Sequence, residues 1–116
     1  MIAVMSEGWT APAHGSEYLD LAARLRPLLD GVPGFISVER FRSLSDPEKL
    51  LSLSFWEDEG AVAAWRNRPE HRAGQARGRS GVFRDYRIRI ADVSRDYTLR
   101  DRAQAPADSD GGRPQA

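Results

Sequence analysis

The chain has 116 residues, 41% of them hydrophobic, and it contains two histidines and no cysteine. A chain of this length forms one domain around a single core. The absence of cysteine excludes a disulfide framework, a thiolate metal site and a thiol nucleophile, and two histidines are too few for the usual metal ligand sets. We therefore expect one globular domain that holds no metal.

The formal net charge is zero, but the charges are distributed unevenly along the sequence. Between residues 66 and 89 there are eight arginines and only two acidic residues, Glu70 and Asp85. A run of like charges is most often a solvated face. The other interpretations are a basic rim that attracts an anionic substrate and a face that pairs with the acidic part of a second copy.

The N-terminal residues 1–7 lack a basic leader, and polar residues interrupt them before an apolar run develops. No later stretch is long and apolar enough to span a membrane. These features predict a cytoplasmic protein that does not contact a membrane.

The first third of the chain predicts a strand followed by a helix. Residues 2–9 alternate well enough for a strand, and a loop at 10–15 follows. Apolar residues then recur every three or four positions over 16–29, which is typical of an amphipathic helix. Glycine and proline in the segment 30–34 end this helix.

Two further strands are predicted at 35–41 and 50–56, joined by a turn at 43–48 that contains serine, aspartate and proline. Regular alternation puts Phe35 and Val38 on opposite faces of the first of these strands. Both faces of the strands carry apolar residues, so we expect both faces to be covered.

The stretch that begins at Asp58 concentrates a tryptophan, a histidine and several arginines, and any chemistry is expected here. Asp58 is a good N-cap, but Pro69 removes an amide donor and disfavours a helical residue before it. We therefore expect two helical pieces that meet at residues 67–68, with the break turning Trp65 and His71 toward one cavity. The apolar residues expected on the inner face of this element are Val62, Trp65, Ala73 and Ala76.

A last strand at 82–93 completes the order strand, helix, strand, strand, helix, strand. In so short a chain this order predicts an α+β fold, a ferredoxin-like antiparallel sheet with both helices on one face. Apolar residues on both faces of the strands indicate that a second copy covers the other face, so we expect a homodimer. Residues 94–99 are expected to extend the last strand toward that copy.

The domain is expected to occupy residues 1–100. From residue 101 to residue 116 the sequence has no aromatic or branched aliphatic side chain. Such a segment buries too little apolar surface to offset its loss of conformational entropy. We therefore predict that it is a disordered C-terminal tail.

A family resemblance is carried by four segments, which are Pro33–Ser37, Leu53–Glu59, Ala64–Trp65 and Glu70–Gln75. Through them the chain resembles the antibiotic biosynthesis monooxygenase family over about residues 1–98. The resemblance implies a ferredoxin-like protomer that pairs into a dimeric α+β barrel. It also implies oxygenation of a quinol, an anthrone or a similar hydroxyaromatic by molecular oxygen without metal or flavin, so no cofactor is expected.

Haem-degrading proteins form a related branch of these barrels. Their helix carries a tryptophan followed ten positions later by the iron-binding histidine, with an asparagine on the first strand. Here Trp65 matches the tryptophan, but Gln75 stands in place of the histidine, and Ser6 or Glu7 stands in place of the asparagine. Because the axial ligand decides haem binding, haem binding or degradation is the weaker alternative.

A cofactor-free oxygenation needs a base, a pocket for a flat aromatic and donors that hold the substrate anion. His71 titrates near neutrality and is the candidate base, and Arg72 or Arg40 is the candidate anion stabiliser. The other candidate substrate-binding residues are Trp65, Trp56, Phe35, Phe83 and Gln75. Simpler roles stay open, with His71 as a surface or capping residue and the aromatic residues as core.

RNA-recognition domains share this topology, but the sequence motif that marks them is absent here. An RNA-recognition domain carries a basic and aromatic run on its third strand, which residues 49–56 lack, so no nucleic acid partner is expected. Two hypotheses remain: a cofactor-independent monooxygenase, and a non-catalytic dimeric module that binds a small aromatic ligand.

Overall fold

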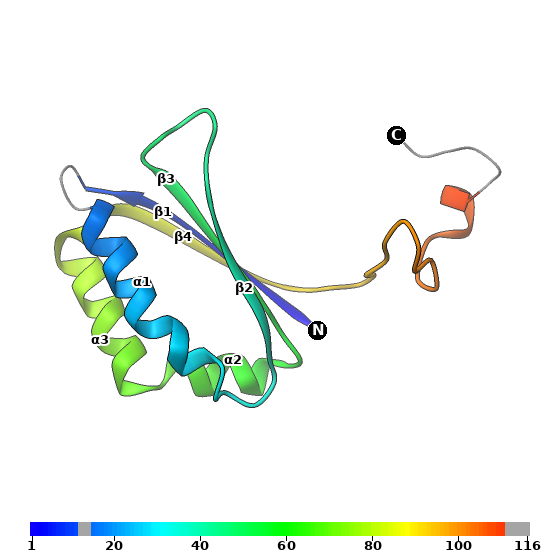
Figure 1. Cartoon of the computed structure of the whole chain (residues 1–116), viewed down its shortest axis with the longest axis horizontal. Helices are drawn as coiled ribbons and strands as arrows, with labels where there is room; N and C mark the ends of the chain where they lie inside the picture. Colours follow the sequence, from blue (N-terminus) through cyan, green and yellow to red (C-terminus); the bar gives the residue numbers. More distant parts are fainter. Residues whose placement is uncertain (12–14, 111–116) are drawn as a thin grey trace.

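The computed structural model describes residues 1–11 and 15–110. In this part of the chain, four strands form one antiparallel sheet in the order β2-β3-β1-β4, and helices α1, α2 and α3 lie on one face of it (Figure 1). The predicted loop residues 12–14 and the end of the predicted tail, 111–116, lie outside the described residues.

The elements follow the predicted order, which confirms the ferredoxin-like α+β fold. They are β1 (Ile2–Thr10), α1 (Gly15–Leu29), β2 (Phe35–Arg42), β3 (Lys49–Trp56), α2 (Glu59–Arg66), α3 (Pro69–Arg77), a π-helical turn (Gly78–Val82), β4 (Phe83–Asp92) and a 3-10 turn (Ala107–Asp110). After β4 the chain runs away from the sheet (Figure 1). The domain boundary at residue 100 stays a prediction.

The predicted break in the second helical element is confirmed. The Asp58 carboxylate caps α2 by accepting a hydrogen bond from the backbone N–H of Ala61 at 2.8 Å. At the other end, the backbone N–H of Asn67 donates to the carbonyl of Ala63 at 3.0 Å. Helix α3 then begins at Pro69, a first helical position where the missing N–H has no partner to lose.

The prediction that Ala73 and Ala76 lie on the inner face of α3 is wrong. Ala73 and Ala76 are exposed, and α3 has no buried residue. Because the break rotates α3 relative to α2, the side of α3 that carries His71 and Gln75 faces the sheet instead. In α2, by contrast, Trp65 is buried as predicted.

The predicted alternation of β2 is also wrong at its start. The pairing of β2 with β3 shifts between Phe35, which lies opposite Trp56, and Ser37, which lies opposite Phe55. This bulge puts Phe35 and Val38 on the same side, where both pack against the core. The rings of Phe35 and Trp56 meet edge to face, with centroids 5.2 Å apart.

The core lies between the sheet and the helices α1 and α2. Its buried residues are Ile2, Leu29, Val32, Trp56, Ala61, Val62 and Trp65. Trp56 is 2% exposed, and its indole N–H donates to the hydroxyl of Ser54 at 2.9 Å. The hydrogen bond satisfies the one polar group of this side chain, so its burial carries no polar penalty.

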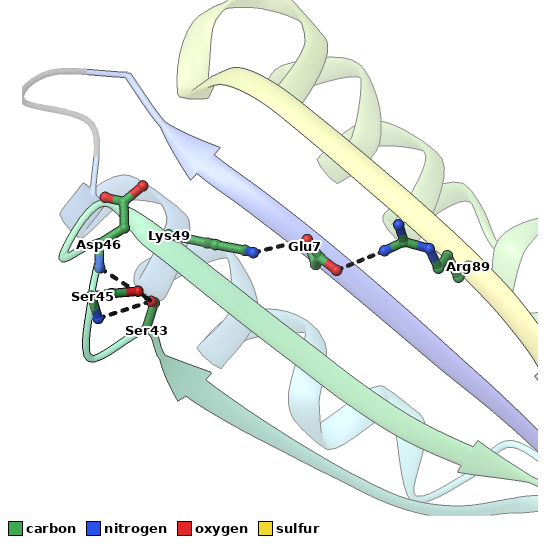
Figure 2. Close-up of polar contacts among 6 residues, drawn as sticks. All are labelled: Glu7, Ser43, Ser45, Asp46, Lys49 and Arg89. Carbon is green, nitrogen blue, oxygen red and sulfur yellow. Dashed lines mark hydrogen bonds and ion pairs between the residues drawn. The ribbon is translucent and has the colours of Figure 1, made fainter.

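The turn between β2 and β3 forms where the sequence predicts it. The hydroxyl of Ser43 accepts hydrogen bonds from the backbone N–H groups of Ser45 and Asp46, at 3.2 and 3.1 Å (Figure 2). The Asp46 carboxylate accepts a further one from the backbone of Glu48 at 3.0 Å. The hydroxyl and carboxylate oxygens of these short side chains thus accept hydrogen bonds from backbone N–H groups of the turn, which tight turns often leave without a backbone acceptor.

The face of the sheet opposite the helices carries an ion cluster. Figure 2 shows Glu7 on β1 between Lys49 on β3 and Arg89 on β4. The Glu7 carboxylate accepts a hydrogen bond from Arg89 at 2.8 Å and lies 3.1 Å from the ammonium of Lys49. The hydrogen bond from Lys49, together with the charges of Lys49 and Arg89, lowers the pKa of Glu7.

The arginine-rich run pairs partly with acidic residues of the same chain. Three ion pairs connect it to the N-terminal half, and these are Arg77 with Glu17, Arg84 with Glu48, and Arg89 with Glu7. The first pair connects α3 to α1. Exposed ion pairs contribute only about 0–1 kcal/mol each to the free energy of unfolding. The pair between Arg77 and Glu17 therefore matters here mainly because it holds α3 beside α1.

The homodimer stays a prediction. Leu51 and Leu53 on the open sheet face are half-buried, and we expect a second copy to cover them. Leu53→Lys should then shift the protein toward monomer in light scattering at micromolar concentration. The control is Leu44→Lys, because Leu44 is fully exposed in the β2–β3 turn. A parent protein that is monomeric would contradict the prediction.

Substitutions at two glycines test the packing of the connection between α1 and β2. Gly34 has a φ of +84°, and a Cβ there would lie 2.7 Å from the Cβ of Ala61. Gly34→Ala should therefore lower the free energy of unfolding by about 2 kcal/mol or more. Gly31→Ala is the matched control, since a Cβ at Gly31 meets only the carbonyl of Leu28 at 3.8 Å. Equal effects of the two substitutions in denaturant unfolding would refute this account.

Candidate functional site

A cavity of about 170 Å³, here called the first chamber, lies between the sheet and the helices. The polar and aromatic residues that line it include Ser6, Arg40, Ser52, Trp56, Trp65 and His71. Ile88 and Ile90 of β4 also line it and are 44% and 47% exposed, so the chamber opens to solvent along this edge strand.

The floor of the first chamber is a polar row across the sheet. Arg40 on β2 pairs with Ser52 on β3, Ser52 pairs with Ser6 on β1, and Ser6 pairs with Ile88 on β4. Paired residues of a sheet point to the same face, and all four line the chamber. Small hydroxyl side chains at positions that usually hold branched aliphatic residues leave the space that the chamber occupies.

The roof of the first chamber is formed where α2 meets α3. The ring of His71 lies against that of Trp65, with centroids 5.0 Å apart and an interplanar angle of 50°. Gln75 follows His71 by one helical turn, so both side chains point down from the same side of α3. The roof thus presents an imidazole and an amide above the polar floor.

The imidazole of His71 is poised to accept a proton. Burial lowers its pKa, the charge of Arg66 lowers it further, and a hydrogen bond with the backbone of Arg66 partly opposes both effects. Its Nδ1 atom is buried and has no hydrogen-bond partner among the described residues. At neutral pH the ring is therefore uncharged, and one nitrogen is left for a ligand.

A second unpartnered nitrogen belongs to Arg40. Its Nε atom is buried without a hydrogen-bond partner in the part of the chain that the structure describes. Arg66, which is exposed, lines the same chamber. Aspartate and glutamate are absent from the residues that line the chamber, so its two guanidinium groups give it a positive potential.

A neighbouring cavity of about 190 Å³, here called the second chamber, lies toward the start of β4. It shares Ser6, His71, Gln75 and Ile88 with the first chamber, so these four residues form the partition. Its walls are aromatic, formed by Tyr18, Phe83 and Tyr86, and one basic and one acidic residue, Arg79 and Glu7, also line it.

Contacts among the aromatic side chains fix the shape of the second chamber. Phe83 packs edge to face on Tyr18 with centroids 5.1 Å apart and lies 6.4 Å from the ring of Tyr86. Gly8 on β1 leaves room for this arrangement, because a Cβ there would lie 2.7 Å from the Phe83 ring.

The structure places five of the predicted site residues in the first chamber, namely His71, Trp65, Trp56, Arg40 and Gln75. Phe83 lies in the second chamber. Phe35 lines neither chamber and packs behind Trp56. Arg72 also lines neither, because it is exposed and its guanidinium donates to the side chain of Asn67.

Sequence reasoning missed Ser52 and Arg66 and gave Ser6 no role in the cavity. Ser6 and Ser52 stand among apolar residues at strand positions that face the helices, and this alternation was the available signal. Arg66 had no distinguishing signal, because choosing among neighbouring arginines requires the rotation at the helix break.

The fold and the site define a ferredoxin-like α+β protein with two adjoining cavities between its sheet and its helices. The chain belongs to the antibiotic biosynthesis monooxygenase family, whose model matches residues 1–77. The resemblance predicted from the sequence is thereby confirmed.

Two relatives illustrate the family. The chain is 43% identical over 94 residues to the jasmonate monooxygenase ABM of Pyricularia oryzae, covering 81% of this chain and 44% of that protein. It is 33% identical over 78 residues to the uncharacterized protein YqjZ of Bacillus subtilis, covering 67% of each. The chain thus spans less than half the length of the first of these relatives.

A solved structure shows the same fold. A mutant of SnoaB, a cofactor-independent oxygenase from Streptomyces nogalater, superposes with a TM-score of 0.72 at 15% identity, covering 85% of this chain and 96% of that one. At this identity the likeness concerns the fold alone.

Two features are absent from the described residues, a metal-binding cluster and a membrane-spanning helix. The described residues contain no group of three or more His, Cys, Asp or Glu side chains placed to hold a metal ion. None of the helices seen in residues 1–11 and 15–110 combines the length and the apolar character that crossing a bilayer requires.

The lowered pKa of His71 predicts a pH dependence of stability. Below the ordinary value of about 6.5 the unfolded chain takes up a proton that the folded protein accepts only at lower pH. The free energy of unfolding should therefore decrease as the pH falls from about 6.5 to the lowered pKa, and keep its full value above that window. His71→Phe should flatten this part of the profile.

Denaturant unfolding between about pH 5 and pH 8 measures the effect. His14, the other histidine, is present in both proteins, so the difference between the profiles reports His71. Identical slopes for the parent and the variant would show that His71 titrates normally in the folded protein.

Proposed function

We propose that this protein is a cofactor-independent monooxygenase that oxygenates a quinol, an anthrone or a similar hydroxyaromatic. The observation that carries the proposal is the buried, unpartnered Nδ1 atom of His71, a residue that lines the first chamber together with Trp65, Trp56 and Arg40. A neutral imidazole of lowered pKa beside aromatic walls and a cation is the arrangement that deprotonation of a hydroxyaromatic requires.

The reaction can be followed for an anthrone. His71 accepts one proton from the substrate, and the resulting anion is stabilised by the guanidinium groups of Arg40 and Arg66. The anion supplies electrons to molecular oxygen. The methylene carbon becomes a carbonyl, one oxygen atom enters the product, and the other leaves as water. The substrate supplies all the electrons, so this route needs no flavin or metal.

The haem alternative is less well supported. Gln75 lines the first chamber at the position where haem-degrading relatives carry their histidine, and an amide is not among the usual axial ligands of haem iron.

A second candidate function rests on the relative from Pyricularia oryzae, whose name gives jasmonate as its substrate. Jasmonate is a carboxylic acid without a phenol, and Arg40 would pair with its carboxylate. A saturated carbon of such a substrate that is remote from any carbonyl group offers no acidic proton and no ready electrons. Oxygen consumption with jasmonate that depends on an added reductant would therefore favour this second function.

The role of His71 is tested by His71→Asn, which keeps a polar side chain near the Nδ1 position but removes the titratable ring. We expect turnover of quinols and anthrones to fall about 10²-fold, the usual effect of losing a general base, with little change in melting temperature. Oxygen uptake, measured with and without a chelator, gives the rate.

Trp65→Phe is the companion variant. A wall of the substrate pocket should show a changed preference among substrates, whereas a residue that only fills the core should show a small loss of stability. If His71→Asn turns over an authentic substrate as fast as the parent protein, His71 is not the base and the proposed mechanism fails.

A further inference from the structure

Two arginines, Arg40 and Arg66, line the first chamber, whose lining residues include no aspartate or glutamate. Arg77, Arg84 and Arg89 each pair with a glutamate. Within the described residues, no ion pair is found for Arg40 or Arg66, although the Nε atom of Arg40 is buried. A buried N–H donor that lacks an acceptor is costly unless a ligand supplies one.

We propose that the substrate is an organic anion whose carboxylate binds Arg40 on the floor of the first chamber, while its ring lies among Tyr18, Phe83 and Tyr86 in the second. This inference rests on the proposed function and narrows its substrate class to carboxylated hydroxyaromatics. His71, which borders both chambers, then faces the middle of the substrate, where the acidic proton is taken. With Arg40 bound to the carboxylate, Arg66 is the guanidinium that stabilises the anion formed by this deprotonation.

The sizes of the two chambers support one ligand that spans both. The chambers measure about 170 and 190 Å³, and each is below the roughly 300 Å³ at which small-molecule sites begin. Arg40 on β2 and Ile88 on β4 are separated by the two inner strands, so their backbones lie about 14 Å apart at the usual strand spacing. This length fits a fused-ring acid better than a single phenol.

The chemistry of the guanidinium group favours a carboxylate at this position. Its planar donors match the two oxygens of a carboxylate in a paired arrangement, which is shorter and stronger than a bond to a neutral group. The Nε–H of Arg40 is one such donor and is buried without a protein acceptor. A neutral amide or ester in the same place would leave the charge of Arg40 uncompensated.

The test compares a dihydroxynaphthoic acid with its carboxamide, two quinols of nearly equal shape that differ in charge. Binding is measured under nitrogen from the quenching of tryptophan fluorescence, since Trp56 and Trp65 line the first chamber. We expect the acid to bind at least about tenfold more tightly than the amide. Equal affinities in the parent protein would overturn the proposal.

Arg40→Gln should abolish this preference, and Arg40→Lys, which keeps the charge but loses the planar donors, should retain part of it. Arg24→Gln is the control, because Arg24 is exposed on α1, lines neither chamber, and donates to the backbone carbonyl of Asp20. Melting temperatures establish that the variants fold. A preference that persists in folded Arg40→Gln, or is lost in Arg24→Gln, would also refute the proposal.

Oxygen uptake separates this inference from the proposed function. Preference for the acid that depends on Arg40, without any oxygen consumption, would support the anion subsite and refute the monooxygenase. Turnover of the amide as efficiently as the acid would refute the anion subsite and support the monooxygenase.

Discussion

The missing amide hydrogen of Pro69 is the constraint on which the cavity depends. In an uninterrupted helix, Trp65 and His71 would project about 120° apart around the axis. The break at Asn67 lets α3 start in a new direction, and the two rings come to 5.0 Å from each other. One proline thus converts the surface of a helix into the roof of a chamber, with an imidazole shielded enough for its pKa to fall.

The polar floor of the first chamber reduces the apolar surface that the core buries. Ser6, Ser52 and Arg40 occupy positions of the sheet that face the helices, where aliphatic side chains would bury more apolar surface. The domain compensates further along β3, where Trp56 is buried and its indole N–H donates to the hydroxyl of Ser54. Along β3 the polar floor is therefore followed by buried core, and the site lies beside Trp56, the least exposed residue of the core cluster.

The sequence predicts best those features that depend on local chemistry. The order of elements follows from hydrophobic periodicity, the start of α2 from Asp58, and the break from Pro69, and all three are confirmed. A bulge at the start of β2 could not be predicted, because it depends on how Phe35 meets Trp56 across the sheet.

The candidate site was predictable to a similar extent. Trp65 and His71 were expected to share a cavity, since the break re-aims one piece of helix against the other, and they do. The choice between Arg66 and Arg72 depends on the angle of rotation at the break, which no local pattern encodes. The second chamber is built by residues from several separate elements, so its existence depends on tertiary packing.

The contact between Gly8 and Phe83 gives this family member an evolutionary route to new ligands. The Phe83 ring occupies the space where a side chain at position 8 would stand, with only 2.7 Å between the ring and the would-be Cβ. One added carbon there would displace the ring and reshape the second chamber while the imidazole, the guanidinium groups and the helix break stay as they are. The shape of the second chamber and the proposed reactive groups of the first therefore depend on separate positions, and selection can alter the first feature without losing the second.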